Sequence, residues 1–172
     1  MSQPREHQQD PEPSAEGPGR VVVGVDGSSG SRVALEAALR SADRRGDRLQ
    51  VIMAYMPEDA YGAWGNGAWA AVPSPDPQRI RDSAQDIADR MVKDVLADRS
   101  AELRTEPDID VEVRPGRAAG VLLEASRDAD ELFVGHRGRG AVRSLMLGSV
   151  GLHCVAGAPC PVTVVPPEDV DS

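Results

Sequence analysis

Five short apolar segments, spaced along the whole chain, constrain the fold more than any other feature of the sequence. The first, residues 20–25, reads RVVVGV, a continuous apolar run of strand length. Such runs are typical of strands that are buried on both faces of a parallel sheet. The other four predicted strands are residues 49–55, 109–113, 131–134 and 161–165.

Segments with helical periodicity separate these strands. The longest covers residues 77–103, where Ile80 and Ile87 lie on one apolar face and the opposite positions are charged. The first helix follows a turn at 26–31 that is rich in candidate N-cap residues, and we expect Gly46 to end it. Its expected buried positions are Val33, Ala34, Ala37, Ala38 and Ala42.

A short helix through Val121, Leu122 and Ala125 and a last helix that begins at Gly148 complete the pattern. Because strand and helix alternate throughout, the sequence predicts an α/β fold. We expect a single doubly wound domain, with a five-stranded parallel sheet in the order 3-2-1-4-5 and helices on both faces.

The ends of the chain and one internal segment lack this pattern. Residues 1–19 are rich in Pro, Gln, Glu and Ser, so we expect a disordered tail before a domain at 20–167, and a second disordered tail at 168–172. Residues 57–77 form a long irregular stretch that contains Tyr61, Trp64 and Trp69. These aromatic residues either form a mobile lid over a ligand or anchor the loop.

Composition and charge exclude several functional classes. With 3% aromatic residues and a formal net charge of −9, the chain offers little for stacking or attracting nucleic acid. The first residues resemble no signal peptide, and no apolar run is long enough to span a bilayer. We interpret Cys154 and Cys160 as reduced, buried thiols. The sequence therefore predicts a cytoplasmic protein that binds neither nucleic acid nor membranes.

The segment from Gly135 to Ser149 is the strongest candidate for chemistry. It contains Gly135, Gly138 and Gly148, and glycines let backbone amides approach a phosphate closely. Gly148 and Ser149 precede a helix, whose first amides and dipole favour an anion. The sequence from 132 to 167 has no Asp or Glu, whereas Arg137, Arg139 and Arg143 lie in the loop. A glycine-rich turn with solvated arginines remains the alternative.

Standard motifs do not decide between these interpretations. The sequence lacks the P-loop pattern G-x-x-x-x-G-K-[ST], and no G-x-G-x-x-G follows the first strand. It also lacks metal-ligand spacing and the G-x-S-x-G pattern of hydrolases.

The order of glycines does resemble a known signature. The pattern Gly135-x2-Gly138-x9-Gly148-Ser149 is similar to the ATP-binding signature of the universal stress protein family. The strand VVGVDGS at 22–28, the segment ADELFVG at 129–135 and the ending CPVTVV at 160–165 agree with it. The resemblance covers residues 20–166.

This resemblance implies roles for several of the candidate residues. Asp26 would face the ribose and adenine, although a role as a turn or capping residue is equally open from the sequence alone. Ala54 would offer backbone groups to the adenine edge. Gly148, Ser149 and Val150 would hold phosphates through amides and a hydroxyl. The full set of candidate nucleotide-binding residues is Gly24, Asp26, Ala54, Val134, Gly135, Arg137, Gly138, Gly148, Ser149 and Val150.

One position departs from the family pattern. Family members that bind ATP usually carry a small hydroxyl residue two positions after Ser149, where this chain has Gly151. Losing one such contact costs on the order of 1 kcal/mol. We therefore expect weaker phosphate binding but not its loss. His136 could contact a phosphate or face solvent, and for His153 we expect no ligand.

The resemblance further implies a stress-response regulatory protein that binds ATP, with or without Mg, as a homodimer through strand 161–165. One alternative is a slow ATPase or phosphotransferase that uses the same pocket. Phosphoryl transfer needs metal-holding carboxylates, and Asp26 is the one obvious carboxylate at the strand ends, so we expect binding with at most slow hydrolysis. Another alternative is a structural dimerisation module without nucleotide.

Overall fold

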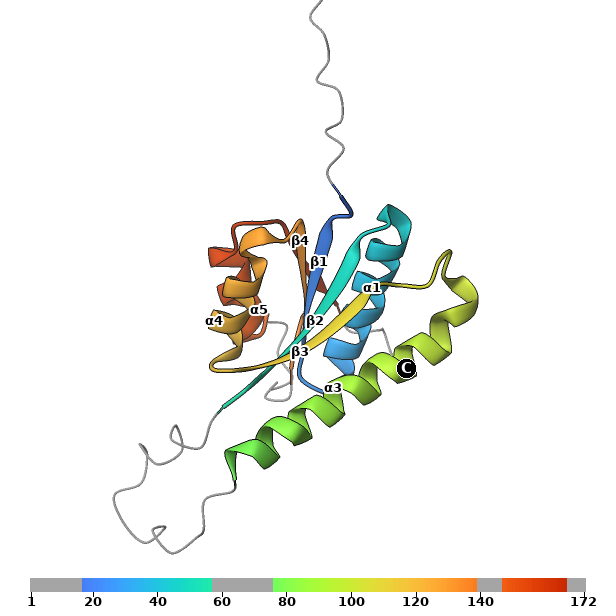
Figure 1. The fold of residues 1–172 in the computed structure, drawn as a ribbon. Coiled ribbons are helices and arrows are strands. Elements are labelled where there is room, and N and C mark those ends of the chain that lie inside the picture. The colour runs from blue at the N-terminus through green and yellow to red at the C-terminus, as the bar shows by residue number, and fades with distance from the viewer. Residues whose placement is uncertain (1–16, 57–75, 139–146, 167–172) are drawn as a thin grey trace, which may run out of the picture.

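Five strands alternate with helices in the computed structural model, which describes residues 17–56, 76–138 and 147–166 (Figure 1). The strands are β1 (Arg20–Val25), β2 (Arg48–Tyr55), β3 (Ile109–Pro115), β4 (Glu131–Gly135) and β5 (Val162–Val165). The α-helices are α1 (Ser29–Arg45), α3 (Pro77–Arg99), α4 (Ala118–Ala125) and α5 (Ser149–Gly157). Two 3₁₀ turns, η1 (Ser100–Glu102) and η2 (Ser126–Asp128), follow α3 and α4.

The sheet has the order β3-β2-β1-β4-β5, and every neighbouring pair is parallel. In the central pair, Val21 lies opposite Leu49 and Val25 opposite Met53. The predicted α/β fold, strand order and parallel sheet are therefore confirmed.

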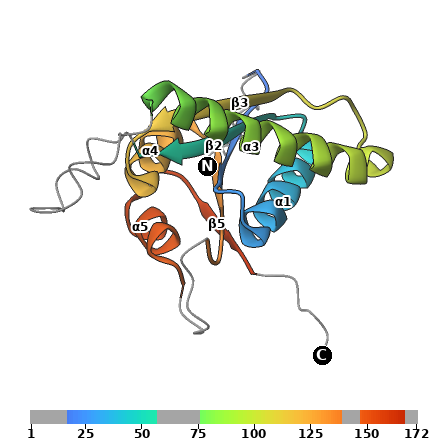
Figure 2. The same ribbon diagram turned by 90° about the horizontal axis from the view of Figure 1, so that it is seen from below.

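The two faces of the sheet pack against different helices because successive side chains of a strand point in opposite directions. Val21 and Val23 belong to the core with α1 and α3, whereas Val22 belongs to the core with α4 and α5. Figures 1 and 2 show the sheet between these two helical layers. Val21, Val22 and Val23 are fully buried, as expected for a strand that is covered on both faces.

Local capping explains where the first helix begins and ends. The hydroxyl of Ser28, the N-cap of α1, accepts a hydrogen bond from the amide of Ser31 at 3.2 Å. Gly46 ends the helix with φ of 72°, a left-handed conformation that favours glycine. The prediction that Gly46 ends this helix is therefore confirmed. The buried stripe includes Leu35 and Leu39, which the expected alanine face missed, while Val33 is only half-buried.

Two predicted boundaries differ from the structure by more than one residue. The long helix was expected to reach residue 103 but ends at Arg99, since Asp43 accepts hydrogen bonds from the amides of Arg104 and Thr105 and holds the following chain on α1. Strand β3 continues to Pro115, and the next amide, that of Gly116, donates to the Tyr55 carbonyl at 2.8 Å.

The cysteines behave as core residues. Cys154 of α5 is fully buried, and burial raises the pKa of its thiol to about 11. Cys160 packs against the same core, and burial also raises its pKa. Both are free thiols in the structure, as expected.

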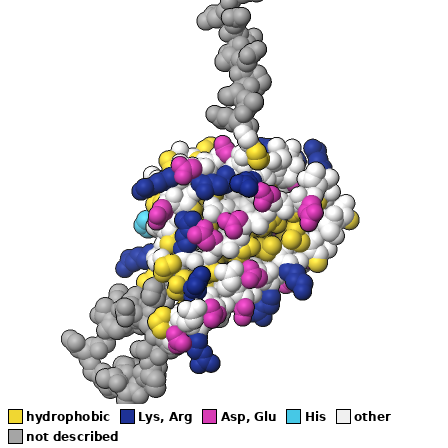
Figure 3. Space-filling view, in the orientation of Figure 1, with side chains coloured by type: hydrophobic (Ala, Val, Ile, Leu, Met, Phe, Trp, Pro, Cys, Tyr) yellow, Lys and Arg dark blue, Asp and Glu magenta, His cyan; other side chains and the backbone are white. Residues whose placement is uncertain are grey.

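The surface in the orientation of Figure 1 mixes acidic and basic side chains (Figure 3). A band of hydrophobic side chains crosses this face where α3 packs along β3. Among the described residues, no helix combines the length and apolar character needed to cross a bilayer.

Candidate functional site

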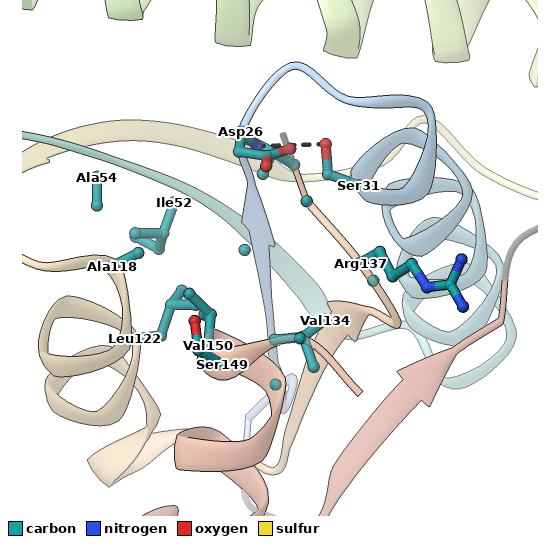
Figure 4. A pocket seen from close by; sticks show the side chains of 16 residues that line it. Asp26, Ser31, Ile52, Ala54, Ala118, Leu122, Val134, Arg137, Ser149 and Val150 are labelled. Carbon is teal, nitrogen blue, oxygen red and sulfur yellow. Dashed lines mark hydrogen bonds between the residues drawn. The ribbon is translucent and has the colours of Figure 1, made fainter. Parts of the chain in front are cut away.

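A cavity of about 340 Å³ opens at the carboxyl ends of the central strands (Figure 4). Ligands bind at this end of open parallel sheets, beside the point where the strand order reverses. Here that point is β1, from which the chain proceeds to β2 on one side and β4 lies on the other. The lining residues are Gly24, Val25, Asp26, Ser31, Ile52, Ala54, Ala118, Leu122, Val134, Gly135, Arg137, Gly138, Gly148, Ser149, Val150 and Gly151.

All ten candidate residues from the sequence line this one cavity. Sequence reasoning missed the apolar wall formed by Ile52, Ala118 and Leu122. Ala118 is the first residue of α4, which follows β3, and β3 lies beside β2 in the sheet. The predicted strand order therefore contained the signal that could have placed Ala118 near Ala54.

Three helix N-termini meet at the cavity. Ser31 lies in the first turn of α1, Ala118 begins α4 and Ser149 begins α5, and all three line it. Each helix start carries amides without intrahelical partners and the positive end of a dipole. The convergence favours an anion or an electronegative group in the cavity.

Asp26, directly after β1, makes hydrogen bonds within the following turn and also lies against the glycine loop. Its Oδ1 accepts hydrogen bonds from the Ser28 amide at 2.9 Å and the Ser28 hydroxyl at 2.6 Å. Its own amide donates to the Ser31 hydroxyl at 3.2 Å (Figure 4). A β-carbon added to Gly138 would collide with Asp26 Oδ2. Asp26 is thus a turn residue through one oxygen, while the other lies against the glycine loop.

Two of the lining glycines lie where the chain packs closely on itself. A β-carbon at Gly135 would lie 2.7 Å from the Gly30 carbonyl oxygen. At Gly24, it would lie 2.6 Å from a methyl group of Leu122. These glycines bring β1, β4 and α4 close together and so shape the cavity.

The start of α5 corrects one expectation. The Gly148 amide donates to the His136 carbonyl at 2.9 Å, so this amide is engaged within the chain and is not an open phosphate donor. The first intrahelical bond runs from the Leu152 amide to the Gly148 carbonyl. Within the described part of the chain, the first-turn amides of α5 without a backbone acceptor are those of Ser149, Val150 and Gly151.

Arg137 lines the cavity, but its side chain extends away from Ser149 and Val150 (Figure 4). Its carbonyl oxygen instead lies 2.6 Å from the position of a β-carbon on Gly30. The half-buried His136 is absent from the lining. His153 is exposed, and its Nδ1 lies 2.7 Å from the Ser149 carbonyl.

Several sequence predictions lie outside the described residues. These are most of the first tail (residues 1–16), the second tail (168–172), the aromatic residues Tyr61, Trp64 and Trp69, and the arginines Arg139 and Arg143.

The end of β2 presents backbone groups to the cavity. The Arg48 amide donates to Gly19 in front of β1, and the Leu49 amide donates to Asp108 in front of β3. Because backbone groups alternate along a strand, even-numbered residues of β2 face β1. Ala54 lies one residue beyond the last paired position, Met53 opposite Val25. Its carbonyl therefore points past the end of β1, where the cavity lies.

A second cavity of about 570 Å³ adjoins the first and shares Asp26 and Ala54 with it. It lies on the α3 side of the sheet, with Arg79 and Ser83 among its lining residues. Two cavities lined by described residues therefore border the carboxyl ends of β1 and β2, one on each face of the sheet.

Comparison with known proteins gives a consistent result. A family model described as the universal stress protein family matches residues 18–166. Universal stress protein Rv2623 of Mycobacterium tuberculosis is 33% identical over 151 residues, which cover 87% of this chain and 48% of that protein. A universal stress protein of Thermus aquaticus is 31% identical over 147 residues, covering 84% and 96% respectively.

Among solved structures, a universal stress protein in complex with cAMP has the same fold. It superposes with a TM-score of 0.60 at 24% sequence identity, over 87% of this chain and 98% of that one.

The fold and the cavity define a doubly wound α/β domain with a ligand pocket at the strand ends. The family match covers nearly all of the described chain, so the protein belongs to the universal stress protein family. The chain spans about half the length of the mycobacterial relatives that it matches.

Proposed function

We propose that this protein binds an adenine nucleotide, ATP among them, in the cavity at the carboxyl ends of β1, β2 and β4. The observation that carries the proposal is the convergence of all ten candidate residues with three helix N-termini on one cavity. An apolar wall and an anion-favouring end in a single pocket suit a molecule with a flat base and a phosphate.

The base would lie between β2 and α4. Ile52, Ala118 and Leu122 supply apolar surface there, and the Ala54 carbonyl supplies an acceptor. An acceptor at this place pairs with the exocyclic amino group of adenine but opposes the carbonyl of guanine. The pocket therefore favours adenine over guanine.

The phosphate would lie at the start of α5, near the amides of Ser149, Val150 and Gly151. The solved structure of a universal stress protein with cAMP supports an adenine nucleotide as the ligand class. Among the described residues, no cluster of three His, Cys, Asp or Glu could hold a metal ion. Magnesium that accompanied ATP would therefore be held through phosphate oxygens and water.

The same geometry supports binding rather than catalysis. Asp26 is the one carboxylate among the described lining residues, and its Oδ1 is held by Ser28. Phosphoryl transfer normally uses carboxylates for the metal and a base for the nucleophile. We infer that nucleotide occupancy, with at most slow hydrolysis, regulates a stress response.

We also propose that two copies associate through β5. This strand ends the sheet, consists of Val162, Thr163, Val164 and Val165, and is half-buried in the single chain. The opposite edge strand, β3, carries Asp110, Glu112 and Arg114, and charges on an edge oppose pairing with another chain. The apolar edge strand β5 is therefore better suited than β3 to pair with a second copy of the chain.

Calorimetric titration tests the nucleotide proposal. We expect saturable ATP and AMP binding by the wild type, and at least tenfold weaker binding of GTP. Gly138→Val should weaken ATP binding at least tenfold, because its side chain would displace Asp26 and enter the loop. Gly120→Val is the matched control, since a β-carbon at Gly120 meets no atom within 4 Å. Lack of adenine-nucleotide binding by the wild type at millimolar ligand would refute the proposal.

A further inference from the structure

We propose that helix α5 forms part of the interface between two copies of this chain. In this interface, the side of α5 that carries Leu152 and Val155 packs against the same side of α5 in the second copy. This inference rests on the proposed association through β5 and adds a second element to that interface.

Leu152 and Val155 differ in exposure from the other large hydrophobic side chains of the described residues. They are 58% and 52% exposed, whereas the others are buried or half-buried. Single exposed hydrophobic residues are common on protein surfaces, but these two are neighbours because residues three apart share one side of a helix. They therefore form one apolar patch on α5.

The exposed surface of α5 also differs in charge from that of the other helices. Charged residues occupy exposed positions on α1, α3 and α4. Helix α5, with the sequence SVGLHCVAG, contains no Asp, Glu, Lys or Arg. A helix without a charged face is typical of one that is covered on all sides. Within the described part of the chain, the sheet and α4 cover α5 on two sides only.

Helical geometry shows in which direction the apolar patch points. A β-carbon on Gly157 would lie 3.4 Å from the methyl groups of Leu123, so this side of α5 faces α4. Because each residue turns a helix by about 100°, Val155 and Leu152 project about 160° and 140° away from Gly157. Figure 2 shows α4 and α5 on one face of the sheet, which ends at β5. The patch therefore lies on the side of α5 away from α4, next to the free edge of the sheet.

Charge favours a second copy of this chain as the partner. With a formal net charge of −9, two copies repel one another over most of their surfaces. The sequence from 144 to 167, which contains both α5 and β5, has no Asp, Glu, Lys or Arg. A two-fold interface brings the same surface from both copies together, so an uncharged surface places no like charges opposite each other. It also offers no charge that would select a partner of opposite charge.

Sedimentation over a dilution series tests the inference through the dissociation constant of the dimer. Val155→Lys should raise this constant at least tenfold, because a two-fold interface would bring two lysines together in a desolvated patch. The variant should still fold, since residue 155 is exposed in the single chain and lysine favours helix more than valine does. Circular dichroism checks the fold.

His153→Lys is the matched control on the same helix. His153 is exposed, and it projects only about 40° away from Gly157, on the side of α5 that faces α4. The variant adds the same charge as Val155→Lys and should leave the dissociation constant within about threefold of the wild type.

Mixing two variants tests whether the patch pairs with itself. Val155→Glu should weaken the dimer as Val155→Lys does, because each variant places like charges opposite each other. An equimolar mixture of the two should contain more dimer than either variant alone at the same total concentration, because opposite charges then meet.

The outcomes separate this inference from the association through β5. A monomeric wild type refutes the association, and this inference with it. A wild-type dimer that Val155→Lys leaves unchanged overturns the role of α5 but not that of β5. Equal weakening by His153→Lys, or a mixture that contains no more dimer than its components, also overturns the role of α5.

Discussion

At Gly135, a β-carbon would lie 2.7 Å from the carbonyl oxygen of Gly30, a backbone atom in the first turn of α1. Nothing flexible can move aside there, because the helix holds that carbonyl. At Gly148, by contrast, the nearest atom, the His136 carbonyl oxygen, would be 3.4 Å away, an ordinary contact. The two glycines belong to one sequence pattern, but only at Gly135 does a backbone contact leave no room for a side chain.

This contrast predicts different stabilities. Gly135→Ala should lower the free energy of unfolding by about 1–3 kcal/mol, because the added methyl group overpacks a backbone contact. Gly148→Ala should lower it by less than about 1 kcal/mol, the usual range for an altered N-cap. Urea denaturation of both variants measures the difference. Equal losses would show that the packing of Gly135 on Gly30 is not the constraint.

At the scale of single elements, β3 is held to its neighbour by a polar network on the α4 side of the sheet. Glu112 accepts hydrogen bonds from Arg114 Nε at 2.8 Å and Nη2 at 2.7 Å, and from Gln50 Nε2 at 3.0 Å. The bonds from Arg114 lower the pKa of Glu112 most, partial burial opposes them, and the bond from Gln50 adds to the lowering.

The lowered pKa predicts how this network responds to acid. A carboxylate whose folded pKa lies below its unfolded value stabilises the fold at pH above that unfolded value. For Glu112, this contribution should be present above pH 4.5 and be lost as the pH falls through the lower folded pKa. Glu112→Gln should therefore be less stable than wild type at pH 7, and the gap should narrow toward pH 3.

Urea denaturation at both pH values measures that gap. Glu106→Gln, on the exposed segment before β3, controls for the loss of one carboxylate. A gap for Glu112→Gln that stays constant with pH would contradict the assignment.

At the scale of the whole molecule, the two edges of the sheet differ in what they offer a partner. Pro161 accepts a hydrogen bond from the Leu132 amide at 2.9 Å, and Val165 from the His136 amide at 2.8 Å. Odd-numbered residues of β5 therefore face β4, and Val164 directs its amide to the free edge. Nearby on α5, Leu152 and Val155 are 58% and 52% exposed.

The edge geometry gives a direct test of the proposed homodimer. Val164→Pro removes an outward amide without removing a bond to β4, so the chain should fold but not pair. Light scattering at micromolar concentration should give a dimer mass for the wild type and a monomer mass for the variant. A monomeric wild type would refute the association. A dimeric, folded variant would place it at another surface.

Much of this architecture was predictable. The apolar runs and helical periodicity are local patterns, so the sequence alone predicted the parallel sheet and the end of α1 at Gly46. The spacing of Gly135, Gly138, Gly148 and Ser149 also predicted a site at the end of β4. Strand and helix types follow from neighbouring residues along the chain, and these are what a sequence displays directly.

Only the tertiary structure decided which groups at that site are already engaged. In the structure, the Gly148 amide donates to the His136 carbonyl, and one oxygen of Asp26 accepts from Ser28. The Leu147 side chain lies next to Gly151. The tertiary structure also supplies the wall at Ala118 and Leu122 from a distant part of the chain. The sequence by itself thus determined the fold and where a ligand pocket lies. The reach and chemistry of that pocket depend on ångström-scale contacts between segments that only folding brings together.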